Sequence, residues 1–141
     1  MAAYGYAQAY RDTAVLTASP GQLVLMLYEG ALKSMAIAKA AFERPKSDFK
    51  RIEVINKHLI KAHRILAELQ GNLNLAEGGD VAKNLHGLYG YHMRRLFEAN
   101  MKKDIGPMLE AERLVRELRD AWAEMLSKRE WAPERAVQEV A

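Results

Sequence analysis

Histidine and the acidic side chains could bind a metal or transfer protons, so their spacing decides whether metal chemistry is expected. A di-metal site in a helical bundle uses Glu-x-x-His pairs that project inward. The residues three positions before the four histidines are instead Ile55, Ile60, Lys83 and Tyr89. The spacings from His58 to His63 and from His86 to His92 do not place two ligands on one helical face. We therefore predict no metal site, and we interpret His92, which falls on an apolar stripe, as a hydrogen-bonded core or boundary histidine.

Nucleophilic and cofactor chemistry are not indicated either. The sequence contains no cysteine, which excludes thiol nucleophiles, zinc–thiolate sites and disulfides. It also lacks the glycine motifs that bind dinucleotides or phosphates and the Gly-x-Ser-x-Gly elbow of hydrolases. The Gly78-Gly79 pair is explained as a turn between helices. We predict no enzymatic activity, with no catalytic residue, no cofactor and no metal.

Composition and charge indicate a cytoplasmic protein. Of the 141 residues, 50% are hydrophobic and 28% are charged, which supports both a core and a hydrated surface. The apolar run Leu23–Tyr28 is far shorter than the roughly 20 residues of a membrane span, and the N-terminal residues lack the features of a secretory signal. We expect no membrane insertion. The net charge is +3, and the basic excess between Lys46 and Arg64 is interpreted as a solvated helix face. RNA binding through this face is a distant alternative, and we predict no nucleic-acid partner.

Four long segments repeat apolar residues at the spacing of an α-helix. Capping residues and helix breakers place these segments from Ser19 to about Glu43, from Ser47 or Asp48 to Gly71, from Asp80 to Lys103, and from Asp104 onward. Core stripes include Ile52 in the second segment and Val81, Leu85, Leu88, His92, Leu96 and Ala99 in the third. Short connections predict an all-α, antiparallel up-down four-helix bundle over residues 19–130. Residues 1–18 form an N-terminal extension, either mobile or docked on the bundle, and residues 131–141 form a flexible tail.

The first segment carries more apolar surface than one bundle helix needs. Leu25, Tyr28, Leu32 and Met35 form a second stripe beside the core stripe. A helix with so wide an apolar surface is either enclosed or keeps a face for a partner. Three interpretations stay open here: a wide core stripe, a surface covered by the N-terminal tyrosines, and a groove for an amphipathic segment of another chain.

Four stretches, in this order and spacing, resemble the flagellar secretion chaperone family, FliS. They are TASPGQLVLMLYEGA at residues 17–31, KAHRILAEL at 61–69, YGYHMRRLFEAN at 89–100 and LRDAW at 118–122. The resemblance covers about residues 4 to 127. The chain departs from the family at residues 90–92, where Gly-Tyr-His stands in place of the common Asp-Tyr-Met.

The resemblance implies a cytoplasmic helical bundle that binds the disordered C-terminal segment of flagellin. In this role it prevents premature polymerisation and assists delivery to the flagellar type III export apparatus. The implied partners are the flagellin C-terminal segment, a flagellar export gate component, and a co-chaperone or regulator. A homodimer in the absence of client is left open. The alternative function is a helical-bundle adaptor or regulator for another exported or flagellar protein.

The candidate client-binding residues combine the second stripe with the third-segment motif and one N-terminal tyrosine. They are Tyr10, Leu25, Tyr28, Leu32, Met35, Tyr89, Met93, Arg94, Arg95, Leu96 and Asn100. Arg94 and Arg95 either bind client carboxylates or carbonyls, or pair within the chain, as Arg94 would with Glu98. Asn100 either contacts the client or caps backbone groups near a helix end. Tyr10 is expected to dock on the bundle until the client displaces it.

Overall fold

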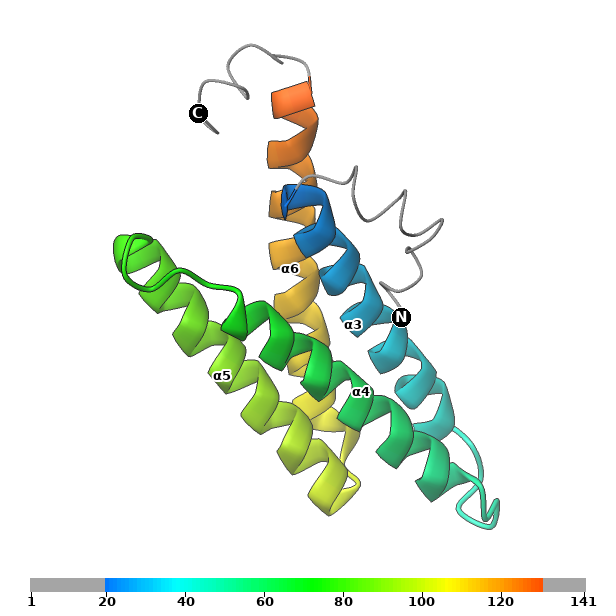
Figure 1. The fold of residues 1–141 in the computed structure, drawn as a ribbon. Coiled ribbons are helices and arrows are strands. Elements are labelled where there is room, and N and C mark those ends of the chain that lie inside the picture. The colour runs from blue at the N-terminus through cyan, green and yellow to red at the C-terminus, as the bar shows by residue number, and fades with distance from the viewer. Residues whose placement is uncertain (1–19, 131–141) are drawn as a thin grey trace, which may run out of the picture. The chain divides into compact units, whose positions relative to one another are not determined.

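The computed structural model describes residues 20–130, and within this range it contains four α-helices and no strand (Figure 1). The helices are α3 (Pro20–Phe42), α4 (Arg51–Gly71), α5 (Gly79–Lys102) and α6 (Ile105–Glu130). The predicted all-α four-helix bundle is thereby confirmed. The N-terminal extension over residues 1–18, the tail over residues 131–141 and the expected docking of Tyr10 lie outside the described residues.

The described residues belong to two compact units. The larger unit comprises residues 27–116, and the smaller one contains residues 20–26 and 117–130 of the described range. Within the larger unit, α4 and α5 lie side by side and run antiparallel (Figure 1). Gln70 Nε2, near the end of α4, donates to the carbonyl of His86 near the start of α5 at 3.0 Å. In the smaller unit, Trp122 Nε1 donates to the carbonyl of Gly21 at 2.7 Å.

Local signals account for most helix boundaries. Helix α3 begins at Pro20, whose fixed φ suits the first helical position, and it ends at Phe42, three residues before Pro45, which cannot continue a helix without strain. Helix α4 ends at Gly71 as predicted. Asp104 Oδ1 accepts the amide of Gly106 at 3.0 Å, which is the predicted cap at the start of α6.

Two predicted caps are wrong. Helix α4 begins at Arg51 after Lys50, which makes no side-chain cap. Asp48 instead accepts the Lys50 amide at 3.0 Å, so its carboxylate stabilises the preceding turn and not the helix. Helix α5 begins at Gly79, one residue before Asp80. Gly79 has a φ of +60°, a conformation open to glycine, so the chain enters the helix earlier than the aspartate position predicts.

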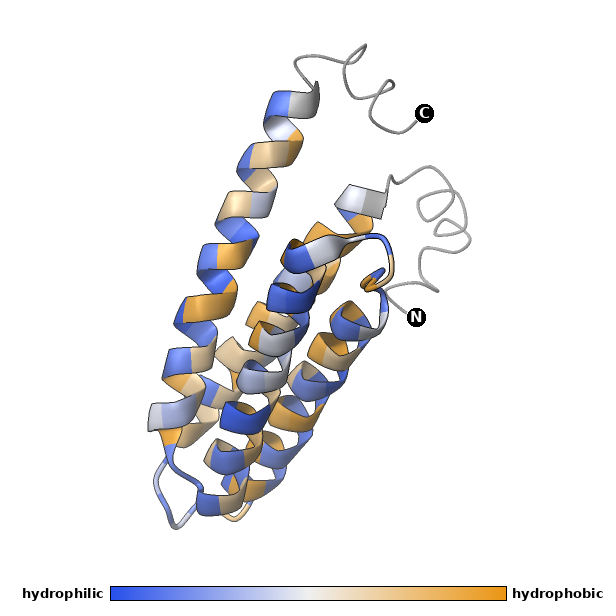
Figure 2. Cartoon of the chain, turned by 90° about the vertical axis from the view of Figure 1, so that its left-hand side faces the viewer, coloured by the Kyte–Doolittle hydropathy of each residue, from blue (hydrophilic) through white to orange (hydrophobic). Residues whose placement is uncertain are grey.

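The core of the larger unit uses residues spaced alternately three and four positions apart. The seam residues of α4 and α5 are Ile55, Leu59, Ala62, Leu66 and Leu69, and Ala82, Leu85, Tyr89, His92, Leu96 and Ala99. This heptad spacing allows neighbouring helices to interlock at a shallow crossing angle. In Figure 2 apolar and polar positions alternate around each helix, as expected where one face enters a core.

Three residues that were predicted to lie in the core are at the surface. Ile52, Val81 and Leu88 have exposed fractions of 45%, 69% and 42%. Val81 and Leu88 each lie one position from the α5 seam, where Ala82 and Tyr89 are buried instead. A stripe counted at 3.6 residues per turn drifts from a seam that repeats every 3.5 residues. Ile52 belongs to the seam period but lies in the first turn of α4.

Candidate client-binding groove

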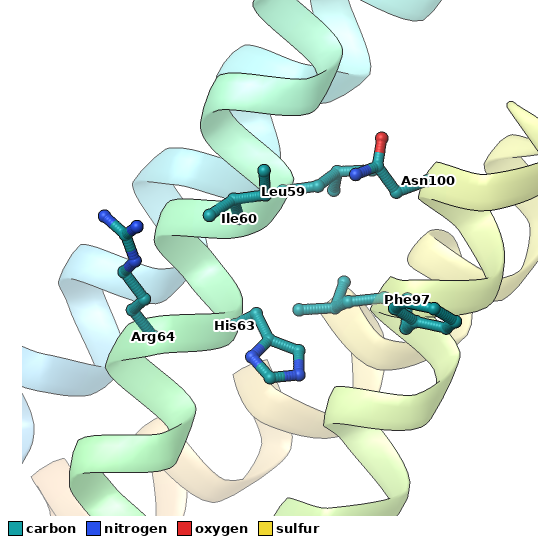
Figure 3. Close-up of a pocket in the computed structure, with 7 residues that line it drawn as sticks. Leu59, Ile60, His63, Arg64, Phe97 and Asn100 are labelled. Carbon is teal, nitrogen blue, oxygen red and sulfur yellow. The ribbon is translucent and has the colours of Figure 1, made fainter.

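An open pocket of about 210 Å³ lies between α4 and α5, and we call it the α4–α5 groove (Figure 3). Its lining residues are Leu59, Ile60, His63 and Arg64 from α4, and Leu96, Phe97 and Asn100 from α5. Leu59 and Leu96 are buried seam residues, whereas Ile60 is 44% and Phe97 is 61% exposed. Ile60 and Phe97 directly follow those seam residues, so they flank the helix interface and leave apolar surface accessible.

Basic side chains border the groove. The guanidinium of Arg64 points to the outer side of α4 (Figure 3). Lys57 and Lys61 are exposed on the same side of that helix, because Lys57 lies three residues before Ile60 and Lys61 lies three residues before Arg64. Burial lowers the pKa of His58, and the positive charges of Lys57 and Lys61 lower it further. This part of α4 therefore combines accessible apolar side chains with positive potential, which complements an apolar segment that carries carboxylates.

At one end of the groove, Lys103 hydrogen-bonds to residues of both α4 and α5. Its Nζ donates to Asn56 Oδ1 at 2.7 Å, to the main-chain oxygen of Asn100 at 2.6 Å, and to Asn100 Oδ1 at 2.8 Å. Lys103 has a left-handed backbone, with φ 51° and ψ 45°, at the C-terminus of α5. Its ammonium thus satisfies a carbonyl that the end of the helix leaves unpaired. Burial, and then the charge of Arg51, lower the pKa of Lys103.

Arg95 pairs within the chain, in a polar network between α5 and α6. Its Nε donates to Glu110 Oε1 at 2.6 Å and its Nη1 donates to Glu98 Oε1 at 2.7 Å. Tyr91 donates to the same Glu110 oxygen at 2.7 Å. The hydrogen bonds from Tyr91 and then Arg95 lower the pKa of the Glu110 carboxyl. Glu98 binds Arg95 and Lys102, so the pairing of Glu98 with Arg94 that the spacing suggested is not the one formed.

A buried polar cluster lies in the core of the larger unit. The hydroxyl groups of Tyr28 and Tyr89 share a hydrogen bond, and the Tyr89 ring makes an edge contact with His92, with 6.3 Å between the ring centroids. His92 is 1% exposed, and both ring nitrogens lack a hydrogen-bond partner. Burial lowers the pKa of His92 to about 4, and Glu110 partly opposes this shift. The prediction of a core histidine is therefore confirmed, whereas its predicted hydrogen bond is wrong.

The predicted client-binding residues lie in different environments. Tyr28, Leu32, Met35, Tyr89 and Leu96 are buried. Leu25, Met93, Arg94, Arg95 and Asn100 retain exposed surface. The α4–α5 groove brings together Leu96 and Asn100, whereas Leu25 belongs to the smaller unit. Tyr10 lies outside the described residues. Buried Tyr28, Leu32 and Met35 fit the interpretation of a wide core stripe on α3.

Five residues that line the groove were not predicted as site candidates. They are Leu59, Ile60, His63, Arg64 and Phe97. The available signal was the position of Ile60 and Phe97, each an apolar residue directly after a seam residue. This signal becomes specific only once α4 and α5 are known to be neighbours.

The described residues contain no group of three or more histidine, cysteine or acidic residues that could hold a metal ion. None of the four helices seen in residues 20–130 is long and apolar enough to cross a membrane. The fold and the groove thus define a helical-bundle protein with an accessible, basic-edged apolar groove.

Comparison with known proteins assigns the family. Residues 2–129 match the family described as flagellar protein FliS. The flagellar secretion chaperone FliS of Bacillus subtilis (strain 168) is 39% identical over 118 residues, which cover 84% of each chain. That of Salmonella typhimurium (strain LT2) is 34% identical, over 87% of this chain and 88% of its own. That of Escherichia coli (strain K12) is 34% identical, over 86% of each. This chain belongs to the FliS family, which confirms the resemblance seen in the sequence. The relatives are named as chaperones, in agreement with a non-enzymatic protein.

Proposed function

We propose that this protein is a cytoplasmic export chaperone for flagellin. In this proposal it binds the disordered C-terminal segment of flagellin, prevents premature polymerisation, and assists delivery to the flagellar type III export apparatus. A flagellar export gate component and a co-chaperone or regulator are its further partners. Membership of the FliS family supports the chaperone role, and the α4–α5 groove is the observation that supports the mode of binding.

The groove suits a client that must stay unfolded for export. Such a client cannot be held as a compact domain, so it binds as an extended or locally helical segment along the chaperone surface. Coupled ordering of a disordered segment buries about 1,000–3,000 Å² and costs roughly 2–5 kcal/mol. The groove is therefore one of several contacts along the client. Ile60 and Phe97 contribute apolar contacts, and the basic edge attracts client carboxylates.

The other predicted residues divide by accessibility. Leu25, Met93 and Arg94 have exposed surface and are proposed as further client contacts. The buried residues Tyr28, Leu32, Met35 and Tyr89 support the packing of α3 and α5 in the client-free chain, and a client reaches them only if these helices separate. Displacement of Tyr10 by the client stays a proposal for the N-terminal residues.

Calorimetry with the C-terminal segment of flagellin from the same source tests the function. We expect one-to-one binding with a large negative heat-capacity change and only modest weakening by added salt, because apolar burial tolerates salt. Steep weakening by salt would instead indicate binding driven by ion pairs between the basic edge and client carboxylates. Absence of binding by the folded protein would refute the proposal and favour the adaptor function.

A pair of phenylalanine variants tests the groove. Phe97→Ala removes the exposed apolar ring from the groove and should weaken binding of the flagellin segment by about tenfold, the effect of losing about 1.4 kcal/mol of apolar contact. Phe49→Ala is the matched control, because Phe49 is 87% exposed in the connection between α3 and α4 and does not line the groove. Equal affinities for the two variants would exclude the groove as a client contact.

A further inference from the structure

The hydrogen bonds of Lys103 fix the orientation of the Asn100 side chain. An ammonium group donates three hydrogen bonds and accepts none. All three donors of Lys103 are occupied, by Asn56 Oδ1, the Asn100 carbonyl and Asn100 Oδ1. The Asn100 amide must therefore turn its oxygen to Lys103 and its nitrogen away from it. The two amide orientations, which are hard to distinguish by shape, are distinguished here by chemistry.

The side-chain amide nitrogen of Asn100 consequently faces the groove. Asn100 is one of the residues that line it, and Figure 3 shows the amide nitrogen directed toward Leu59 on the α4 side. Asn100 Nδ2 donates to no group in residues 20–130. The groove floor next to it is formed by Leu59 and Leu96, which offer no acceptor. An oriented hydrogen-bond donor thus lies beside an apolar hollow.

We propose that Asn100 Nδ2 is a polar anchor that donates to an unpaired main-chain carbonyl of the client segment bound in the α4–α5 groove. This inference rests on the proposed function and specifies how one client contact is made. An extended segment, or the last turn of a short helix, presents carbonyls with no partner in its own backbone. A neutral amide beside an apolar floor suits such a neutral acceptor. Client carboxylates fit the basic edge at Arg64 instead.

Lys103 is the positioning residue in this arrangement. It makes no contact with the client, and it holds the Asn100 amide so that the donor is oriented before the client arrives. Recognition of a main-chain carbonyl depends on backbone conformation and not on side-chain identity. The anchor therefore fixes where the client backbone lies while tolerating different client sequences.

Two isosteric variants test the anchor by calorimetry with the flagellin C-terminal segment. Asn100→Asp keeps an acceptor for Lys103 but replaces the groove donor with a second oxygen. Asn56→Asp places the same negative charge beside the same lysine, and Asn56 does not line the groove. Because an acceptor would then face an unpaired carbonyl, Asn100→Asp should weaken binding about tenfold or more, while Asn56→Asp should stay within about twofold of the wild type.

The outcomes separate the anchor from the proposed function. Binding by the wild type with equal affinities for the two variants would overturn the anchor and leave the chaperone function intact. No binding by the wild type would overturn both. As an independent readout, the side-chain amide resonance of Asn100 should shift when the client segment is added to the wild-type protein, and that of Asn56 should not. An unchanged Asn100 resonance would also refute the hydrogen bond.

Discussion

Replacing His92 by leucine should change how the stability of the protein depends on pH. His92 is buried without a hydrogen-bond partner, and burial lowers its pKa to about 4. In the unfolded chain the same imidazole has a pKa near its ordinary value of about 6.5. Between these two values the unfolded state binds more protons than the folded state, so stability falls as the pH falls. Leucine removes this protonation and suits a heptad core position.

The expected size follows from the two pKa values. Well inside the pH range between the two pKa values, each pH unit lowers the free energy of unfolding by about 1.4 kcal/mol. The loss of stability attributable to His92 between about pH 7 and about pH 4.5 is therefore about 2 kcal/mol. Urea unfolding followed by circular dichroism at both pH values gives the free energy of unfolding for the wild type and for His92→Leu. The other titrating groups, including Glu110 and His58, are common to both proteins, so their contributions cancel in the comparison.

The wild type should lose about 2 kcal/mol more than His92→Leu on acidification. An equal loss in the two proteins would refute the reasoning, because it would mean that the imidazole is protonated as easily in the core as in the unfolded chain. A larger loss in the variant would reverse the predicted sign. Direct titration of the His92 ring resonances provides a second check, since the folded protein should show a midpoint near pH 4.

Three further substitutions can be checked by the same denaturation assay at neutral pH. Gly90→Ala should stabilise the protein by up to about 1 kcal/mol, because the added carbon meets only side-chain atoms at 3.5 Å; a loss of stability would contradict this. Gly78→Ala should destabilise it, because the added carbon would lie 2.6 Å from the Asn74 carbonyl oxygen; unchanged stability would show that the turn relaxes freely. Tyr89→Phe should cost about 1 kcal/mol, because it removes the buried hydrogen bond to Tyr28; an unaltered midpoint would mean that this bond contributes nothing.

The positions of the helices could be predicted from the sequence more reliably than the residues that pack at the interfaces between the helices. Helix boundaries such as Pro20 and Gly71 follow from backbone preferences that act within one helical turn, and these preferences can be recognised from the residue types in the sequence. The burial of Tyr89 in place of Leu88 depends on which face of α5 meets its neighbours, and adjacent apolar residues do not reveal that face. The seam is evident only when the three-and-four spacing of several helices is compared.

The groove could not be predicted from the sequence for a different reason. Ile60 and Phe97 come from different helices, and each alone resembles a scattered surface residue. The role of Asn100 depends on Lys103, whose left-handed backbone brings its ammonium back onto the end of α5. Sequence periodicity does not predict that conformation in a non-glycine residue. The partner-free state of His92 likewise depends on what surrounds the ring in three dimensions.

Helices α4 and α5 are tied together at both ends. Gln70 bonds the His86 carbonyl at one end, and Lys103 bonds Asn56 at the other, with the seam packed in between. The groove between them is therefore pre-organised, and its walls lose little conformational freedom when a segment binds. Almost all of the conformational entropy that is lost on association is then lost by the partner. Affinity at this site should be tuned mainly by how readily the bound segment adopts its conformation, so a client that is partly ordered in advance gains the most.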